Sequence, residues 1–314
     1  MKIDVHAHHF PVEYLDRMDR YGDPQLTVYI RRAGMSSANP HDLSAHFRNM
    51  DLAKVDMQVL SISSQLPYYA SESQAVELAR LANDIYAGIV REHPKRFAAF
   101  ACTPLPHIQA SLDEMHRALD ELGMVGVTAG TTVMGKSIVD PAFDPFFAEL
   151  NRRKAVLFIH PMGGSGGSQL IDSTNLTWPI GAPLEDTICM LHFMQKEIPG
   201  RFPEIKIILP HLGGFAPFVM ARLDELKHRF LPNTAPPPSV QAKYFWYDSV
   251  NAQPGALRCT QEVVGSERLL MGTDYPFWRD AGFKLGVDYV SQAGLSAPDV
   301  DCILGGNAQK LLGL

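Results

Sequence analysis

Residues 1–9, Met-Lys-Ile-Asp-Val-His-Ala-His-His, form a short apolar strand that runs into histidines. His6 and His8 are two positions apart, and because strand side chains alternate between faces, we expect both to point the same way, roughly 6.5–7 Å apart. Two imidazoles at that spacing can share one cation, since a zinc–nitrogen bond is about 2.0–2.1 Å long. His9 falls on the opposite face and is not expected to join them. A histidine pair alone also fits a solvated strand end, so the later histidines and aspartates decide between the two interpretations.

Length, composition and charge limit the class of protein. The chain has 314 residues, of which 46% are hydrophobic, so it can bury a large core. Its net charge of −6 and lack of a basic run argue against nucleic acid or an anionic membrane as the main partner. No apolar run approaches the roughly 18–20 residues of a membrane span. The N-terminus lacks a signal-peptide pattern and the cysteines are widely separated, so we expect a cytoplasmic protein with reduced thiols at Cys102, Cys189, Cys259 and Cys302.

Apolar segments alternate with amphipathic segments along the whole chain. The expected strands are residues 3–5, 57–63, 96–103, 123–128, 155–160, 205–211, 244–250 and 268–274, and the expected helices are residues 43–54, 72–92, 108–122, 144–153, 184–197, 215–230, 255–264 and 298–311. This alternation predicts an α/β fold, a (β/α)8 TIM barrel that forms a single domain over residues 1–314, with a small insertion at about 11–42 over one mouth of the core. The alternative, an open doubly wound sheet, would place a glycine-rich phosphate-binding turn after the first strand, where this chain has His-Ala-His-His.

Metal-ligand residue types end four of the expected strands. His6 and His8 end the first strand, His160 ends the fifth, His211 the sixth and Asp274 the eighth. Active sites of such barrels lie at the C-terminal ends of the strands, so these side chains should meet on one rim. Each has an ordinary explanation by itself; Asp274, for instance, could cap the next helix. Their shared position nevertheless predicts a metal site.

The motifs around these residues resemble the amidohydrolase superfamily. More narrowly, they are similar to its branch of non-oxidative decarboxylases typified by 2-amino-3-carboxymuconate-6-semialdehyde decarboxylase. The resemblance runs nearly end to end. It is carried by His6-x-His8, His160-Pro161, His211-Leu-Gly-Gly, Gly272-Thr-Asp-Tyr-Pro276, Pro94-Lys-Arg-Phe97, Trp178-x-x-Gly-x-Pro-x-Glu-x-Thr187 and Pro217-Phe-x-x-x-Arg222.

The resemblance implies a site for one divalent metal ion, most often zinc, with manganese as the alternative. Carried over by position, it makes the ligands His6, His8, His160 and Asp274. Relatives with two ions bridge them with a lysine that ends strand four, and residues 123–128 contain no lysine. A water bound to such an ion has its pKa lowered toward about 7.

The resemblance also implies roles for residues around the ion. His211 would be the acid/base residue, and Asp274 could share that catalytic role. Arg222 would hold a substrate carboxylate across a homodimer interface, and Trp178 would line the pocket. The family's second carboxylate-binding arginine has no aligned counterpart in this chain; the nearest candidates are Arg31, Arg32, Arg48 and Arg229.

These implications leave two classes of reaction open. The first is a metal-dependent carboxy-lyase that decarboxylates a small aromatic or unsaturated carboxylic acid, in which His211 or Asp274 protonates the carbon that loses CO2. The second is a metal-dependent hydrolase or hydratase acting on a lactone, an amide or an enoic acid, because the same ion and water would serve on the same scaffold. A metal-binding barrel without enzymatic activity is a third interpretation.

Overall fold

The computed structural model describes residues 1–22 and 24–314 of the chain. Eight strands form one parallel sheet in the order β1 (Ile3–His8), β4 (Met57–Ser61), β5 (Phe97–Cys102), β6 (Gly126–Gly130), β9 (Val156–His160), β10 (Lys206–Leu209), β11 (Trp246–Asp248) and β12 (Leu269–Leu270). The last strand returns to the first: the Val5 amide donates to the Met271 carbonyl at 2.9 Å, and Ala7 forms a parallel bridge with Tyr275. The predicted (β/α)8 TIM barrel is therefore confirmed.

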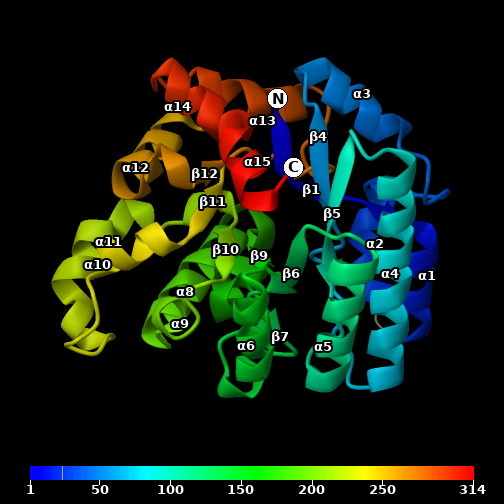
Figure 1. Ribbon diagram of the computed structural model, residues 1–314, viewed down its shortest axis with the longest axis horizontal. Coiled ribbons are helices and arrows are strands. Elements are labelled where there is room, and N and C mark those ends of the chain that lie inside the picture. The colour runs from blue at the N-terminus through cyan, green and yellow to red at the C-terminus, as the bar shows by residue number, and fades with distance from the viewer. Residues whose placement is uncertain (23) are drawn as a thin grey trace.

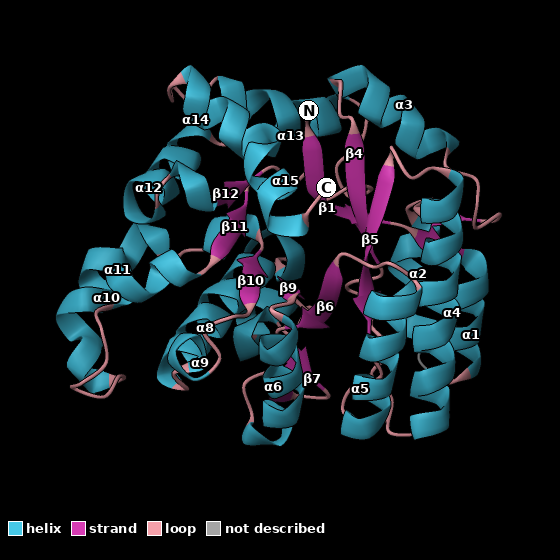
Figure 2. Ribbon diagram, viewed as in Figure 1, coloured by secondary structure: helices cyan, strands magenta, loops and turns pink. Residues whose placement is uncertain are grey.

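Helices surround the strands (Figures 1 and 2). Those that follow the barrel strands are α3 (Ser44–Ala53), α4 (Glu72–Glu92), α5 (Ile108–His116), α6 (Asp144–Arg153), α8 (Ala182–Gln195), α10 (Met220–Leu226), α12 (Pro254–Val264) and α13 (Ala281–Ser291), and the chain ends with α14 (Ala297–Asp301) and α15 (Asn307–Leu312). α4 has the predicted bounds. The helix expected at residues 215–230 is instead the short α10 flanked by 3₁₀ turns, and no helix was predicted at α13, which contains two helix-weakening glycines.

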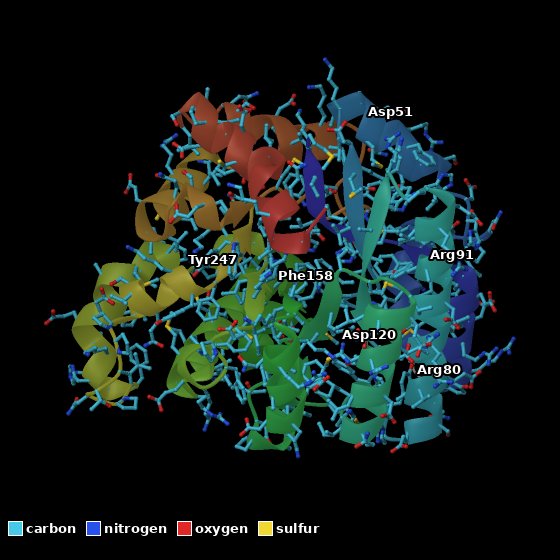
Figure 3. The ribbon with its side chains drawn as sticks, viewed as in Figure 1. Asp51, Arg80, Arg91, Asp120, Phe158 and Tyr247 are labelled. Carbon is cyan, nitrogen blue, oxygen red and sulfur yellow. The ribbon has the colours of Figure 1, made fainter. Side chains whose placement is uncertain are left out.

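Two apolar layers stabilise the barrel. The inner layer fills the space enclosed by the strands, and the larger outer layer lies between the strands and the helices. Removing apolar surface from water contributes roughly 25 cal/mol per Å². Figure 3 shows the division between inside and outside: Phe158 and Tyr247 are buried, whereas the charged side chains lie on the outer surface at Asp51, Arg80, Arg91 and Asp120. Over the described ranges, no helix is both long enough and apolar enough to cross a membrane.

The insertion after β1 reaches the mouth of the barrel. It contains α1 (Val12–Arg20), α2 (Pro24–Arg32) and a small sheet made by β2 (Phe10–Pro11) and β3 (Ser36–Ser37). Arg31 joins α2 to α1, because its Nη2 lies 2.7 Å from Asp16 Oδ1 and 2.9 Å from Asp19 Oδ2. Tyr29 on α2 stacks on Phe277, which follows β12, with ring centroids 6.3 Å apart. The insertion therefore contributes an aromatic side chain at the C-terminal ends of the strands.

Candidate active site

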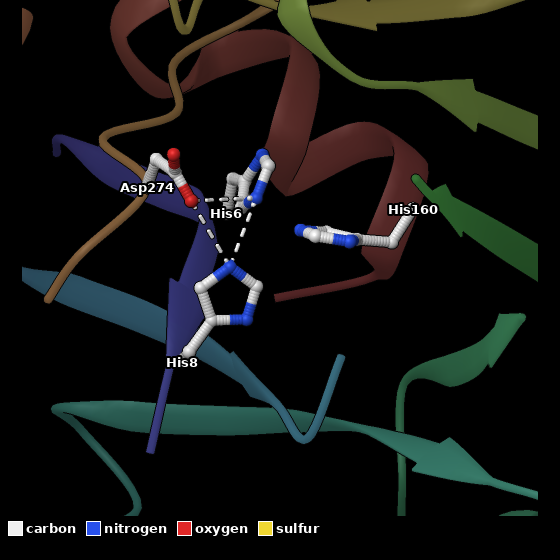
Figure 4. A group of neighbouring side chains, drawn as sticks. All are labelled: His6, His8, His160 and Asp274. Atoms are coloured by element: carbon white, nitrogen blue, oxygen red, sulfur yellow. Dashed lines mark hydrogen bonds and ion pairs between the residues drawn. The ribbon is translucent and has the colours of Figure 1, made fainter. Parts of the chain in front are cut away.

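Three histidines and one aspartate from distant parts of the chain converge at the C-terminal end of the barrel (Figure 4). His6 and His8 lie on β1, His160 is the last residue of β9, and Asp274 follows β12. Each offers one ligand atom, and the four atoms lie within 4.8 Å of one another. His8 Nε2 is 3.1 Å from both His6 Nε2 and Asp274 Oδ1, and His6 Nε2 is 3.3 Å from the same Asp274 oxygen.

Hydrogen bonds at the outer ring nitrogens turn the imidazoles toward this meeting point. The Nδ1–H of His6 donates to Asp248 Oδ2 at 2.7 Å, and that of His160 donates to the Pro161 carbonyl at 2.8 Å. His160 Nε2 then carries a lone pair, yet this buried atom has no hydrogen-bond partner among the described residues. A histidine that is held by its far nitrogen and directs the other into a site is the usual arrangement of a metal ligand. The four residues therefore fit one divalent metal ion.

Burial and neighbouring charges shift the pKa of each of these groups. Burial lowers the pKa values of His8 and His160, so both rings are neutral and able to bind a cation. Burial also lowers the pKa of His6, but the negative charges of Asp248 and Asp274 outweigh it and raise that pKa to about 9. Burial raises the pKa of Asp274, but the charge of His6 and hydrogen bonds from the nearby histidines hold it well below its usual value. A metal ion at this point would displace the extra proton from His6.

Asp4 anchors the segment that carries Asp274. Its fully buried carboxylate accepts the Thr273 amide at 3.0 Å on one oxygen and the Thr273 hydroxyl at 2.6 Å on the other. The Asp274 amide donates to the His6 carbonyl at 2.8 Å. Asp274 has a φ of +59°, in the left-handed region that non-glycine residues rarely adopt. These bonds hold the strained residue against β1 and bring its carboxylate to the histidines.

His211 lies beside the four converging residues. It follows β10, and its Nε2 is 4.0 Å from Asp274 Oδ2. Its backbone amide donates to Asp248 Oδ1 at 2.9 Å, and its Nδ1 lies 2.8 Å from Oδ2 of the buried Asp186 on α8. Burial lowers the pKa of His211, but the negative charges of Asp186 and Asp274 outweigh it and raise that pKa well above its usual value. The ring is therefore suited to hold and donate a proton beside the candidate metal site.

A pocket of about 400 Å³ opens onto His160, His211 and Asp274. Trp178 and Phe277 line it, and their rings stack at 27° with centroids 6.3 Å apart. Tyr29, Trp178, Phe277 and Trp278 make much of the wall aromatic, which suits a planar ligand. No lysine or arginine of residues 1–22 and 24–314 lines this pocket.

The arginines considered for carboxylate binding lie elsewhere on the described chain. Arg222 is exposed on α10 and does not line the pocket of its own chain. Arg48 lines a separate polar cavity of about 380 Å³ together with Arg279. Arg31 is ion-paired within the insertion, and Arg32 and Arg229 are exposed.

Two buried carboxylates of the site were not predicted from the sequence. Asp248 ends β11, the same kind of position as the strand-end histidines, but the expected strand ran to residue 250 and so hid this strand end. Asp186 lies within α8, and nothing in the local pattern distinguishes it from other helical acids. Its role becomes visible only when α8 packs beside the residue that follows β10.

Known proteins match this chain over most of its length. A family model described as Amidohydrolase matches residues 3–314. The 2-amino-3-carboxymuconate-6-semialdehyde decarboxylase of Dictyostelium discoideum is 28% identical, over 100% of this chain and 92% of that protein. The 6-methylsalicylic acid decarboxylase of Penicillium expansum is 30% identical, over 88% of this chain and 85% of that protein. A structure of 5-carboxyvanillate decarboxylase from Novosphingobium aromaticivorans, with manganese and 4-hydroxy-3-methoxy-5-nitrobenzoic acid, has a TM-score of 0.86 at 22% identity and covers 100% of this chain and 96% of that one.

Proposed function

Because the chain belongs to the amidohydrolase family, we propose that it is a metal-dependent, non-oxidative decarboxylase of a small aromatic carboxylic acid. The observation that carries the proposal is the convergence of three histidines and one aspartate that could hold one divalent ion, with His211 beside them, at a pocket with aromatic walls. The relatives at 28% and 30% identity are decarboxylases by name. An anionic, planar substrate matches both the cation site and the shape of the wall.

The ion would be held by His6, His8, His160 and Asp274. We propose zinc, because imidazole nitrogens and a carboxylate are common zinc ligands. Manganese is the alternative, since the solved 5-carboxyvanillate decarboxylase contains it. When bound, a divalent ion acts as a Lewis acid and draws electron density from a substrate oxygen.

The chain's own side chains orient the substrate and move one proton. Decarboxylation breaks a carbon–carbon bond and leaves its electron pair on the ring carbon, which takes up a proton as CO2 departs. His211 is the proposed donor, a role typically worth about 10²–10⁴-fold in rate. Asp274 Oδ2, 4.0 Å from His211 Nε2, can share that proton. Trp178 and Phe277 would stack on the ring, and His211 would regain its proton from water, since each turnover consumes one.

We further propose a homodimer in which Arg222 reaches the pocket of the other copy. Within the described ranges no lysine or arginine of the same chain lines the pocket, and Arg222 is exposed near Phe218, which is 82% exposed. A guanidinium group can bind a carboxylate through two parallel hydrogen bonds, which an ammonium group does not match.

Mixed subunits test this arrangement. Arg222→Ala and His211→Ala homodimers should each be nearly inactive. Random exchange between them should restore about a quarter of the wild-type activity, because half of the dimers then contain one complete site out of two. Each variant incubated with itself is the control. No recovery after demonstrated subunit exchange would exclude a shared site.

We also propose that residues 1–314 act as one domain in the cytoplasm. The family model covers nearly all of these residues. All four cysteines are free, which is typical of a reducing compartment.

A substrate screen tests the proposed reaction. The protein, loaded with zinc or manganese, is incubated with hydroxybenzoates, nitrobenzoates and muconate-type acids, and CO2 release and water addition are measured separately. We expect CO2 release from at least one aromatic acid and background release from the His211→Ala control. Water addition or ring opening without CO2 release would contradict a decarboxylase and favour a hydratase or a hydrolase.

A further inference from the structure

Asp186 is a buried carboxylate that takes almost no part in building the fold. Its side chain is fully buried, and its Oδ2 lies 2.8 Å from His211 Nδ1. Its other oxygen, Oδ1, has no hydrogen-bond partner in the part of the chain that the structure describes. Burying a carboxylate is unfavourable unless hydrogen bonds or an opposite charge compensate for the lost water. The contact with His211 is therefore what accounts for a carboxylate at this position.

The preceding residue shows how a structural carboxylate on the same helix behaves. Glu185 is 5% exposed, and its Oε2 accepts hydrogen bonds from the Thr131 hydroxyl and the Met162 amide, both at 2.9 Å. Its Oε1 accepts the Ser165 amide at 2.8 Å. These bonds join α8 to the segments that follow β6 and β9. Asp186 makes no comparable link and contacts a reactive side chain instead.

We propose that Asp186 is the positioning residue for His211: it keeps a proton on Nδ1 and thereby directs Nε2 toward the substrate. The inference rests on the proposed function of His211 as the proton donor. The proton-bearing nitrogen of a neutral imidazole is set by what its other nitrogen contacts. A carboxylate on Nδ1 opposes a flip of the ring, so Nε2 stays at the pocket, 4.0 Å from Asp274 Oδ2.

The proton that reaches the substrate carbon leaves from Nε2. The carbon–carbon bond electrons form the new carbon–hydrogen bond, and CO2 is released. The Nδ1 proton remains on the now neutral imidazole, and Asp186 remains a carboxylate throughout. Without Asp186, the ring can rotate and place either nitrogen toward the pocket, so only part of the population would be competent to donate.

Nuclear magnetic resonance of ¹⁵N-histidine-labelled protein tests the contact without any substrate. In the metal-loaded protein we expect a downfield Nδ1–H resonance that is absent from His211→Asn and is lost or strongly shifted in Asp186→Asn. Metal content should be unchanged in both variants, because neither residue belongs to the proposed ligand set. An unchanged His211 resonance in Asp186→Asn would overturn the proposal.

Kinetics then test whether the contact serves the reaction. Asp186→Asn should lower kcat by roughly 10²-fold, the lower end of what a positioned acid contributes, with little change in KM. In the His211→Asn background the same substitution should cost almost nothing more, because its partner is already absent. Glu185→Gln is the matched control, and its effect on kcat/KM should be equal in the two backgrounds. An equal cost of Asp186→Asn in both backgrounds would show a structural role and overturn the proposal.

The two proposals fail in different ways. If no acid released CO2, the proposed function would be wrong, whereas the resonance experiment would still decide whether Asp186 positions His211.

Discussion

His8 and His9 are adjacent in the chain, and both are buried, but they lie in two different histidine groups. His8 faces the pocket side of β1, where its Nε2 is 3.1 Å from Asp274 Oδ1. His9 faces the insertion and α3, where its Nδ1 is 3.2 Å from His46 Nε2 and its Nε2 donates to the Pro40 carbonyl at 2.8 Å. Strand alternation explains the separation, because neighbouring residues on a strand point to opposite faces.

The two groups differ in how completely the chain satisfies them. Each ring nitrogen of His9 and His46 lies near a polar atom of a neighbour: His46 Nδ1 is 2.8 Å from Gln58 Oε1, and the other two contacts are those to His46 and Pro40 given above. In the group around His8, by contrast, His160 Nε2 has no partner among the described residues and a carboxylate is shared between imidazoles. The group around His8 is therefore distinguished by a carboxylate beside three converging imidazoles and by a ring nitrogen without a partner, and a cluster of histidines alone is not sufficient evidence for a cation site.

Removing a ligand should have the largest effect and should separate the two groups. His6→Ala or Asp274→Ala is expected to reduce bound metal to trace amounts and CO2 release to background, because each deletes one of the converging donors. His46→Asn, in the other group, should keep its metal, although it should lose about 1–3 kcal/mol of stability through an unsatisfied His9 or Gln58. Metal content is measured by mass spectrometry after dialysis. Full occupancy in both ligand variants would contradict the ligand assignment.

Removing His211 should separate metal binding from turnover. His211→Ala is expected to keep its metal, because the ring lies beside the ligand set, and to lower kcat by about 10²–10⁴-fold through loss of the acid. Metal analysis and CO2 release on the same preparation measure both quantities. If the variant lost its metal in parallel with its activity, His211 would have to be counted among the ligands.

Acid should weaken the group formed by His9 and His46. Burial lowers the pKa of His9 from 6.5 to about 4. Below pH 6.5, His9 takes up a proton in the unfolded chain but not in the folded one, so protonation favours unfolding. The stability that neutral, buried His9 contributes is therefore complete above that pH and is lost as the pH falls toward 4. The loss should be on the order of 3 kcal/mol. Urea unfolding of the metal-free protein at a series of pH values measures this loss as the difference in unfolding free energy from His9→Asn. If the unfolding free energies of the two proteins changed in parallel with pH, the assignment of the loss to His9 would be wrong.

The barrel and the converging residues were predictable because both depend on local patterns. An apolar run that ends in a histidine or an aspartate, as at His160 and Asp274, shows which residue emerges at the end of a strand. The parallel order of the strands then brings these ends together. The same reasoning separated His9 from His6 and His8, and His9, which follows β1, contacts His46 instead.

What the sequence could not reveal depends on contacts between segments. Asp186 touches His211 only because α8 packs beside the end of β10. Tyr29 reaches Phe277 only because α2 lies over the mouth of the barrel. Neither contact leaves a periodicity or a spacing in the chain, and neighbouring residues such as Glu185 and Asp186 look alike until their partners are known.

The smallest expected effect comes from Asp248, which contacts His6, a proposed metal ligand, on the side away from the proposed ion. Its Oδ2 accepts the His6 Nδ1–H at 2.7 Å, and its Oδ1 accepts the His211 amide at 2.9 Å. Asp248→Asn keeps the shape of the side chain but removes its negative charge. That charge makes the His6 ring more basic and holds its Nε2 toward the other ligands, so metal affinity should fall by about 10–100-fold. Competition with a chelator of known affinity measures the change, with His46→Asn as the control that leaves metal affinity unchanged. Equal metal affinity in Asp248→Asn and wild type would mean that β1 alone orients His6. The hydrogen bond from His6 to Asp248 would then matter no more for metal binding than the hydrogen bonds of His9 and His46.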